Sequence, residues 1–412
     1  MHSIFRYRSY TMTFIIMSLG AFLLMKCINN ENGKLNTVIK PGYEEFAGSD
    51  KCISCHRNIY DTHVHTAHFL TSAMALEKNI KGSFESEKNN FIYNNGSMIS
   101  MEKRQGGMYQ VAYINGVEKK SQRFDMVIGS GTKGQSYATW SNNRLFQLPI
   151  TYFTSADQWC NSPGYPGKIA FNRPITSRCL ECHSTFATKI TAEGTEPEEF
   201  DKNRIILSVD CERCHGPAKK HVEFQTLNPK ETKGAFIINP ASFSRQQNLD
   251  LCALCHGGRL QKSKPSFAFI AGDKLSDYFV TDTTFKDVNN IDVHGNQYGL
   301  LVASKCFKMS NTLTCSTCHN THENEKGNTS LFSQRCMNCH NSEHAVACKM
   351  SKDLGDDIKK NCIDCHMPEQ PSMAIAVMLK GATSPTPALM RTHFIKVYAD
   401  ETKKYLTNFK RY

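Results

Sequence analysis

One five-residue pattern, Cys-x-x-Cys-His, occurs seven times along this chain of 412 residues. The two thiols of such a pattern add across the vinyl groups of a porphyrin, and the adjacent histidine is placed to bind the haem iron. Zinc ribbons and redox dithiols also use Cys-x-x-Cys, but neither requires a histidine directly after the second cysteine. The seven copies therefore predict seven covalently bound haem c groups.

The motifs predict both the attachment residues and the first iron ligands. The cysteines expected to form thioether bonds are Cys52, Cys55, Cys179, Cys182, Cys211, Cys214, Cys252, Cys255, Cys315, Cys318, Cys336, Cys339, Cys362 and Cys365. The histidines expected to bind one iron each are His56, His183, His215, His256, His319, His340 and His366. Because this type of haem attachment takes place outside the cytoplasmic membrane, the motifs also predict an exported protein. The total of 18 cysteines is likewise far too many for an ordinary cytosolic protein.

Histidines outside the motifs decide how many irons keep an open coordination position. A second histidine ligand restricts an iron largely to electron transfer, whereas an open position lets it bind and transform a small molecule. Eight histidines lie outside the motifs and beyond His2, close to the number that seven doubly ligated irons need. We predict that six of them are distal ligands: His68, His221, His294, His322, His344 and His393.

Three of these predicted ligands come shortly after a motif histidine. His221, His322 and His344 are too close in sequence to reach the far face of the haem that the preceding motif binds. They would therefore ligate neighbouring haems and hold the chain in a compact stack. A surface histidine or a propionate contact is the alternative for each of them. His63 and His65 remain, and one of these two is surplus.

The segment after the first motif predicts a helix over residues 57–78, which contain no glycine or proline. His68 lies twelve residues after His56. That separation is about 18 Å along a helix. His68 is therefore expected to serve a haem other than the one that His56 binds.

Between residues 91 and 165 the pattern changes to short strands. Asn95-Gly96, Gly106-Gly107 and Asn115-Gly116 are two-residue hairpin signals, and they predict a small antiparallel sheet inserted between the first two motifs. Gly129–Gly134 has the spacing of a dinucleotide-binding loop. No strand–helix–strand pattern surrounds it, so a glycine turn is expected there instead.

The predicted fold class is mainly α, with little regular structure around a stack of covalent haems and with this one small β insertion. The predicted segments are a signal (1–27), a tether (28–49), the first haem segment (50–90), the β insertion (91–165), a segment for haems 2 to 4 (166–260), a motif-free excursion (261–305), and a segment for haems 5 to 7 with a C-terminal helix (306–412).

The N-terminus resembles an export signal. Arg6 and Arg8 precede an almost wholly apolar run, Met12–Met25, which is too short for a comfortable membrane span. The run ends before Cys27 in a pattern typical of lipoprotein signals, although Lys26 stands where a small residue is usual. We therefore predict a lipid on Cys27, with an uncleaved signal anchor or ordinary cleavage as the alternatives.

The formal net charge of +11 does not indicate a nucleic-acid partner. An oxidised haem with two ionised propionates carries about −1, so seven haems would bring about −7. The lysine and arginine excess is better explained as counter-charge for propionates.

Three further cysteines, Cys160, Cys306 and Cys348, lie outside the motifs and the signal. Cys306 and Cys348 could form a disulfide, or Cys306 could bind an iron. A buried, inert thiol is the alternative for each, and Cys160 has no evident role.

The phrases between the motifs resemble those of multihaem c-type cytochromes, of the type that includes the tetrahaem electron acceptor of hydroxylamine oxidoreductase and the doubled-CxxCH cytochromes. The resemblance covers most of residues 50–395 and rests on Thr66-Ala67-His68, Gln135-Ser136-Tyr137, Gln147-Leu148-Pro149, Ser162–Pro166, Cys179–His183, Cys211–His221, Cys315–His322 and Cys362–Pro368. It implies that His68 and His221 are distal ligands. His63 stands where the pattern usually has tryptophan.

The resemblance and the histidine count favour an electron-transfer protein. Its partners would be redox proteins, either a quinol-oxidising complex or other cytochromes, and a lipid on Cys27 would hold it at a membrane. A multihaem reductase of a small nitrogen or sulfur compound, with one open iron, is the alternative. All seven motifs end in histidine, which argues against a reductase that marks its open iron with a motif lysine. A third hypothesis, an adaptor that docks through the β insertion, would act alongside electron transfer.

Overall fold

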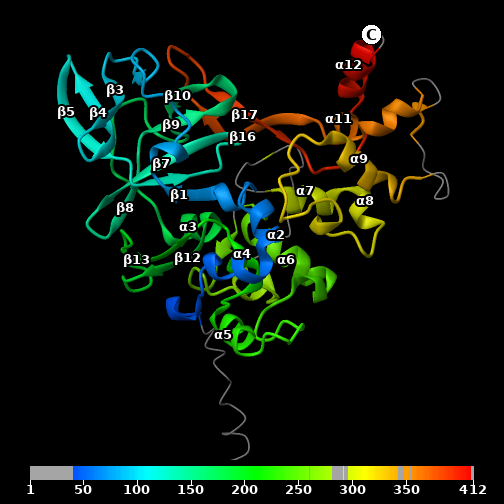
Figure 1. Cartoon of the computed structure of the whole chain (residues 1–412). Helices are drawn as coiled ribbons and strands as arrows, with labels where there is room; N and C mark the ends of the chain where they lie inside the picture. The colour runs from blue at the N-terminus through cyan, green and yellow to red at the C-terminus, as the bar shows by residue number, and fades with distance from the viewer. Residues whose placement is uncertain are drawn as a thin grey trace, which may run out of the picture. The chain divides into compact units, whose positions relative to one another are not determined.

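The computed structural model describes residues 40–258, 260–280, 291, 296–341, 348–351 and 355–409 (Figure 1). The predicted signal, Cys27, His294 and His344 lie outside these residues. The chain divides into two units, and the second, Pro41–Tyr412, contains the structure described below. No helix within the described ranges has both the length and the apolar character needed to cross a membrane.

The prediction of a mainly α fold is wrong. Helices make up 31% of the structure and strands 25%, and the strands form several antiparallel sheets. The central strands of the four-stranded sheet are buried over runs of residues and not in strict alternation: Met98–Arg104 and Gly107–Ile114 each contain three consecutive buried residues. The prediction underestimated the strands because it treated the haems as the main core.

Two sheets occupy the segment between the first and second motifs. A four-stranded sheet has the order β2-β3-β4-β5, formed by Asn90–Ile92, Met98–Arg104, Gly107–Ile114 and Val117–Arg123. A seven-stranded sheet contains β1 (Ser72–Met74), β6 (Met126–Ile128), β7 (Gly134–Ser141), β8 (Arg144–Gln147), β9 (Ile150–Phe153), β10 (Gln158–Asn161) and β11 (Arg173–Pro174). The three predicted hairpins are present, because Asn95-Gly96 and Asn115-Gly116 lie in turns between successive antiparallel strands. The turn between β3 and β4 is Gln105-Gly106, one residue earlier than predicted, since Gly107 already pairs with Arg104.

Gly129–Gly134 is a turn between two antiparallel strands, as the sequence predicts, because β6 pairs directly with β7. Gly134 also allows close packing. A Cβ atom at this position would lie 2.6 Å from the carbonyl oxygen of Tyr152 on the adjacent β9.

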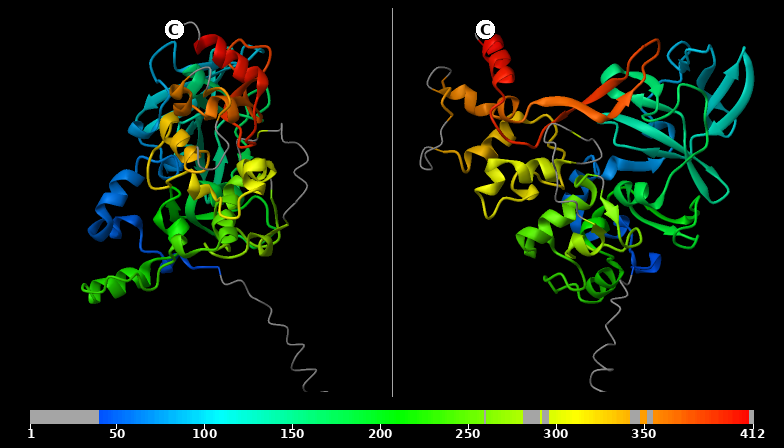
Figure 2. Two further views of the ribbon diagram at one scale, coloured as in Figure 1. Left: turned by 90° about the vertical axis from the view of Figure 1, so that its right-hand side faces the viewer. Right: turned by 180° about the vertical axis from the view of Figure 1, so that it is seen from behind.

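Three two-stranded sheets complete the β structure. They are formed by β12 (Ser184–Lys189) with β13 (Phe200–Leu207), β14 (Gln261–Lys262) with β15 (Phe279–Val280), and β16 (Glu369–Val377) with β17 (Thr386–Arg391). The long β16–β17 hairpin reaches back from the last motif to the large sheet (Figure 2). Val377 and Ala388 of this hairpin pack there against Phe153 and Cys160.

The described helices are short and lie mostly on the other side of the molecule from the four-stranded sheet (Figure 1). They are α2 (Ile53–His63), α3 (Ser177–His183), α4 (Cys211–His215), α5 (Lys219–Leu227), α6 (Arg245–His256), α7 (Gln297–Ala303), α8 (Lys305–Lys308), α9 (Thr329–Met337), α11 (Ile363–His366) and α12 (Ala399–Phe409). The predicted C-terminal helix corresponds to α12.

The helix predicted over residues 57–78 is wrong beyond His63. The Thr66 hydroxyl donates a hydrogen bond to the carbonyl oxygen of His63 at 2.7 Å and accepts one from the Phe69 amide at 3.2 Å. Such local side-chain bonds compete with helical ones. The chain then turns, and β1 pairs with β6. His68 therefore lies on a turn after α2 and not on its continuation.

A conventional apolar core supports the sheets. Trp159, Tyr137, Ile99 and Met101 are each at most 2% exposed, and they pack together between the two larger sheets. The Trp159 indole nitrogen donates to the Ser83 carbonyl oxygen at 2.7 Å. This core provides a rigid wall beside the motif-bearing helices.

Candidate haem-binding site

Each motif forms about one helical turn. The amide of the motif histidine donates to the carbonyl oxygen of the first motif cysteine in His56, His319, His340 and His366, at 2.8 to 3.1 Å. Residues three and four positions apart lie on one face of a helix. The turn therefore presents both thiols and the imidazole to the same side, as attachment to one porphyrin requires.

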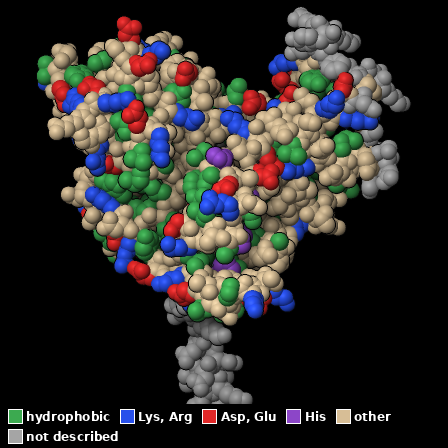
Figure 3. Space-filling view, viewed as in Figure 1, with side chains coloured by type: hydrophobic (Ala, Val, Ile, Leu, Met, Phe, Trp, Pro, Cys, Tyr) green, Lys and Arg blue, Asp and Glu red, His purple; other side chains and the backbone are tan. Residues whose placement is uncertain are grey.

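All seven motif histidines line one continuous cavity of about 2990 Å³. Every motif cysteine except Cys55 also lines it. Pockets for a single small ligand usually have volumes of about 300–1,000 Å³. The cavity is thus large enough for several bulky ligands, and its lining is mainly apolar. Histidine side chains are visible in the hollow of the surface (Figure 3).

Thiols of different motifs approach one another inside this cavity. Hydrogen-bond contacts join Cys52 to Cys211, Cys182 to Cys255, Cys252 to Cys315, and Cys336 to Cys362. All of these cysteines are free thiols. The attachment points of motifs 1 and 3, 2 and 4, 4 and 5, and 6 and 7 are therefore direct neighbours.

Two weaker contacts join these pairs into a series. The pKa of Cys252 is raised by its hydrogen bond with Cys315, by burial and by the nearby Cys214 of motif 3. Motif 3 therefore lies beside motif 4. The pKa of Cys336 is raised by its hydrogen bond with Cys362, by burial and by the nearby Cys318 of motif 5. Motif 5 therefore lies beside motif 6. The order of neighbours is 1-3-4-5-6-7. Motif 2 lies beside motif 4, through Cys182 and Cys255, and beside motif 3, through a hydrogen bond from Arg213 to the Glu181 carbonyl oxygen.

Three motif histidines face a histidine from elsewhere in the chain. The ring centres are 6.2 Å apart for His256 and His68, 6.1 Å for His215 and His322, and 6.2 Å for His319 and His393. A metal–imidazole bond measures about 2.0–2.1 Å, so two imidazoles on opposite sides of one metal ion have ring centres about 6 Å apart. Each pair therefore has the spacing of two axial ligands to one iron.

The electrostatics of these histidines suit metal binding. Burial, with the neighbouring His256, His63 and His319, lowers the pKa of His68 to about 4. Burial, with His319 and His256, lowers the pKa of His393 to about 4. Both rings are therefore neutral at pH 7, which leaves a nitrogen lone pair for a metal ion.

Hydrogen bonds orient several imidazoles. Nδ1 of His215 lies 2.9 Å from the Ile238 carbonyl oxygen, Nδ1 of His366 lies 3.1 Å from that of Lys396, and Nδ1 of His221 lies 2.8 Å from that of Ala235. A carbonyl oxygen can only accept, so each Nδ1 carries the proton and each Nε2 is left for a metal.

His183 has a different partner, because its Nδ1 lies 3.0 Å from the Thr71 hydroxyl oxygen. Neither Thr71 nor the carbonyl partners could be identified from the motifs, since they lie far from them in sequence.

The predicted ligand His221 and the two remaining histidines, His63 and His65, lie in different surroundings. His221 lines the cavity, whereas His65 is exposed and does not line it. His63 is 7% exposed, and its Nε2 lies 3.5 Å from Asp210, the residue that caps α4. His63 also lies 6.2 Å from His322, in an edge-on arrangement like that of His68 and His256. His215 belongs to a motif and His63 does not, so His215 is the motif histidine that lies opposite His322.

The described cysteines outside the motifs, Cys160, Cys306 and Cys348, are free thiols. Cys306 and Cys348 line the cavity. Cys160 is fully buried on β10, and burial raises its pKa far above that of an ordinary thiol. A buried group of this kind is the inert thiol that the sequence left open as one alternative.

Comparison with known proteins agrees with this geometry. Residues 135–216 match the family described as cytochrome c554 and c-prime, and this range includes the second and third motifs. This segment of the chain is therefore similar to a family of c-type cytochromes. The match spans the polar strand β7, the attachment helices α3 and α4, and the core between them.

Two individual proteins are similar to this chain. The C-type polyheme cytochrome OmcC of Geobacter sulfurreducens is 21% identical over 243 residues, which cover 53% of this chain and 30% of OmcC. The chain thus spans less than a third of that relative. The crystal structure of the outer cell wall cytochrome OcwA aligns with a TM-score of 0.54 at 17% identity, over 87% of this chain and 81% of OcwA. That likeness shows a shared fold. Both similar proteins are described as cytochromes.

Proposed function

We propose that this chain is a heptahaem electron carrier, with one haem c on each motif and most irons held between two histidines. The observation that carries the proposal is the single cavity in which all seven motif histidines meet, three of them opposite a second imidazole. Bound haem would supply a one-electron redox centre at each motif. Filled sixth positions favour electron transfer over the binding of a substrate.

The protein's own residues would perform three tasks in this proposal. His68, His322 and His393 would close the irons bound at motifs 4, 3 and 5, because each lies opposite that motif's histidine. His221, which lines the cavity, would close another iron, as would His294 and His344. Backbone carbonyls would hold the ring orientation through Nδ1.

Contacts between motifs support a continuous path for electrons. The neighbouring thiols give the order 1-3-4-5-6-7, and motif 2 branches from this series where motifs 3 and 4 meet. An electron could therefore enter near one end of the series and leave near the other without a moving part. We propose that the donor is a quinol-oxidising complex or another cytochrome, and that the acceptor is a terminal redox partner.

The export signal and Cys27 support a location outside the cytoplasmic membrane. We propose that a lipid on Cys27 anchors the protein at a membrane surface. Labelling with a radioactive or clickable fatty acid tests this, and a Cys27→Ser variant should lose the label.

A matched pair of variants tests the ligand assignment. His68 faces His256 in the cavity, whereas His65, three residues earlier, is exposed outside it. His68→Ala should convert one of the seven haems from low spin to high spin in the electron paramagnetic resonance (EPR) spectrum, and His65→Ala should convert none. Haem content is measured by intact mass and should stay at seven in both. An unchanged spectrum in fully loaded His68→Ala protein would reject the assignment.

A further inference from the structure

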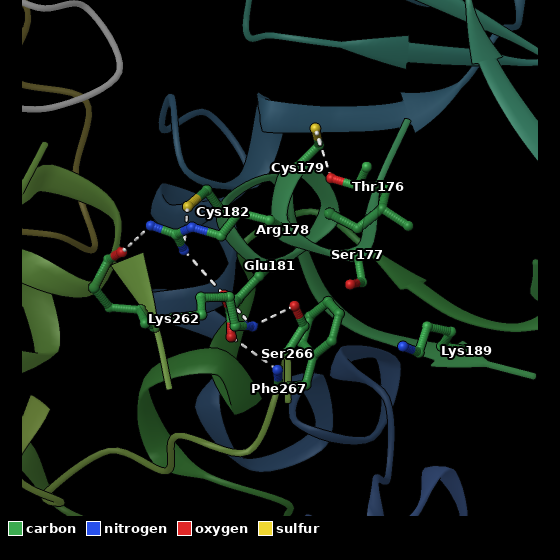
Figure 4. Close-up of polar contacts among 12 residues, drawn as sticks. Thr176, Ser177, Arg178, Cys179, Glu181, Cys182, Lys189, Lys262, Ser266 and Phe267 are labelled. Carbon is green, nitrogen blue, oxygen red and sulfur yellow. Dashed lines mark hydrogen bonds and ion pairs between the residues drawn. The ribbon is translucent and has the colours of Figure 1, made fainter. Parts of the chain in front are cut away.

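The second motif carries a group of charges that electron transfer alone does not require. Glu181, inside this motif, is 1% exposed. Its carboxylate accepts hydrogen bonds from Arg178 at 3.0 Å, from Lys262 at 3.3 Å and from the Phe267 amide at 2.8 Å (Figure 4). Buried carboxylates persist when they are paired in this way.

Arg178 connects two motifs at once. One guanidinium nitrogen lies 3.0 Å from Glu181 and 3.3 Å from the sulfur of Cys182, both in motif 2. The other donates to the carbonyl oxygen of Leu254, in motif 4, at 3.1 Å. Arg178 therefore bridges motif 2 and motif 4 directly.

The balance of charge at motif 2 is positive. Arg213, from motif 3, donates to the backbone carbonyl oxygen of Glu181 at 3.0 Å, while Arg178 and Lys262 bond to its carboxylate. Lys189, also labelled in Figure 4, is paired with two carboxylates, those of Glu193 and Glu198. These four cations and three carboxylates leave a net charge of +1 beside an attachment sulfur.

A positive charge favours the redox state that holds one more electron, so this arrangement raises the reduction potential of a haem at motif 2. The effect is strong where water is excluded, because the effective dielectric constant is low there. The side chains of Arg178 and Lys262 are only 29% and 21% exposed. Nearby charge and hydrogen bonding are general means by which proteins tune haem potentials.

The hydrogen bond of His183, the motif 2 histidine, also favours a higher reduction potential. His215 and His366 share their Nδ1 protons with backbone carbonyls, whereas His183 has the Thr71 hydroxyl as a partner. A strong acceptor at Nδ1 makes an imidazole a more basic ligand, which favours the oxidised metal. A hydroxyl is a weaker acceptor than a peptide carbonyl, so His183 favours the oxidised state less than His215 or His366 does.

We infer that Arg178 is a positioning residue that makes the haem at motif 2 an electron-accepting side branch of the series. This inference rests on the proposed electron-carrier function and deepens it. One electron passing from motif 4 to motif 2 oxidises the first centre and reduces the second, and no bond or proton changes place. Arg178 favours this direction through its charge and fixes the separation of the two motifs by bridging them.

Potentiometric titration of the haem-loaded protein tests the inference. Arg178→Gln should shift the redox equilibrium of one haem at least tenfold toward its oxidised state, which lowers its midpoint potential by about 59 mV for one electron. Arg178→Lys should restore most of that loss because it keeps the charge. Arg204→Gln is the matched control, since Arg204 is an exposed arginine paired with Glu44, and it should leave every midpoint unchanged.

Lys262→Gln provides a second variant that leaves the bridge to Leu254 intact. Lys262→Gln should lower the same midpoint potential by a smaller amount. If Arg178→Gln does not yield haem-loaded protein, Lys262→Gln tests the inference alone. Seven haems with unchanged midpoints in the maturing variants would overturn the inference and leave the electron-carrier proposal standing. A wild-type protein with fewer than seven haems would instead contradict that proposal.

Discussion

Two regions of the molecule have different interiors. They are the sheet region, residues 72–174, and the motif region, residues 177–256 and 315–366. The sheet region has a core of its own, in which Trp159, Tyr137 and Ile99 are almost inaccessible to solvent. In the motif region, α5 buries no residue and α9 buries Ser333, whereas α6 buries four residues, three of them apolar. The helices of the motif region face a cavity where the sheet region has packed side chains.

This difference indicates that the two regions depend on haem to different extents. Packed apolar side chains stabilise a sheet without help, since buried apolar area is the main source of folding free energy. Helices as short as these are not stable alone. In the motif region, the apolar faces of the porphyrins would supply the missing contacts, so attachment and folding would occur together.

The largest expected effect is that of withholding haem. Chain produced without haem attachment should exchange its backbone amides rapidly at residues 211–256 and 315–366, while residues 98–114 stay protected. The reason is that only the motif region loses its core. Hydrogen exchange followed by mass spectrometry measures this. Equal protection of both regions without haem would contradict the distinction.

The next largest effect should come from replacing Trp159, one of the two tryptophans. Trp159 is 2% exposed and packs against the rings of Tyr137, Phe84 and Tyr152. Trp159→Ala should lower the free energy of unfolding by about 3–5 kcal/mol, because it leaves a cavity in a closed core. Denaturant unfolding measures the loss, and the visible haem spectrum of the folded protein should not change.

Trp140 supplies the control within the same region. It is only partly buried, and Lys202 lies over its ring at 5.3 Å. Trp140→Ala should cost clearly less than Trp159→Ala. Equal losses would mean that the sheet core does not dominate the stability of this region.

A smaller effect is expected at an ion pair in the motif region. Arg335 donates to the two carboxylate oxygens of Glu325 at 2.5 and 2.7 Å and to the carbonyl oxygen of Cys318 at 2.7 Å. The hydrogen bond from Arg335 lowers the pKa of Glu325. The pair therefore stabilises the fold above the ordinary glutamate pKa of about 4.3, and this contribution is lost as the pH falls through the lower folded-state pKa.

Glu325→Gln should cost about 1–2 kcal/mol at neutral pH and flatten the acid side of the stability curve. Unfolding measured from neutral to acidic pH tests both points. Glu118→Gln breaks a comparable pair with Arg104 on the exposed side of the sheet region and should have a smaller effect. A larger loss at Glu118 than at Glu325 would contradict this account.

Short-range structure was easier to predict from the sequence than tertiary structure. The hairpin turns were predictable because glycine and asparagine at those positions have few alternatives. The end of α2 was not, because it depends on the Thr66 side chain and on pairing between β1 and β6. The fold class was wrong because short strands without regular alternation of burial give weak signals beside seven strong motifs.

The pairing of histidines also lay beyond the sequence. Counting showed that enough histidines exist, but His68 and His256, or His215 and His322, are distant in sequence and meet only in the folded chain. Thr71 and Arg178 could not be singled out for the same reason. Their importance depends on Nδ1 of His183 and on the carbonyl oxygen of Leu254, which no motif reveals.

The central claim is that the cavity of the motif region holds seven haems, most of them closed by two histidines. A potentiometric titration of the purified protein, followed by EPR and referred to a haem count from intact mass, tests it most directly. The account predicts seven haems and a ferric spectrum dominated by low-spin signals that disappear in successive one-electron steps. Fewer than seven haems, or a prominent high-spin signal that shifts when nitrite or hydroxylamine is added, would contradict it.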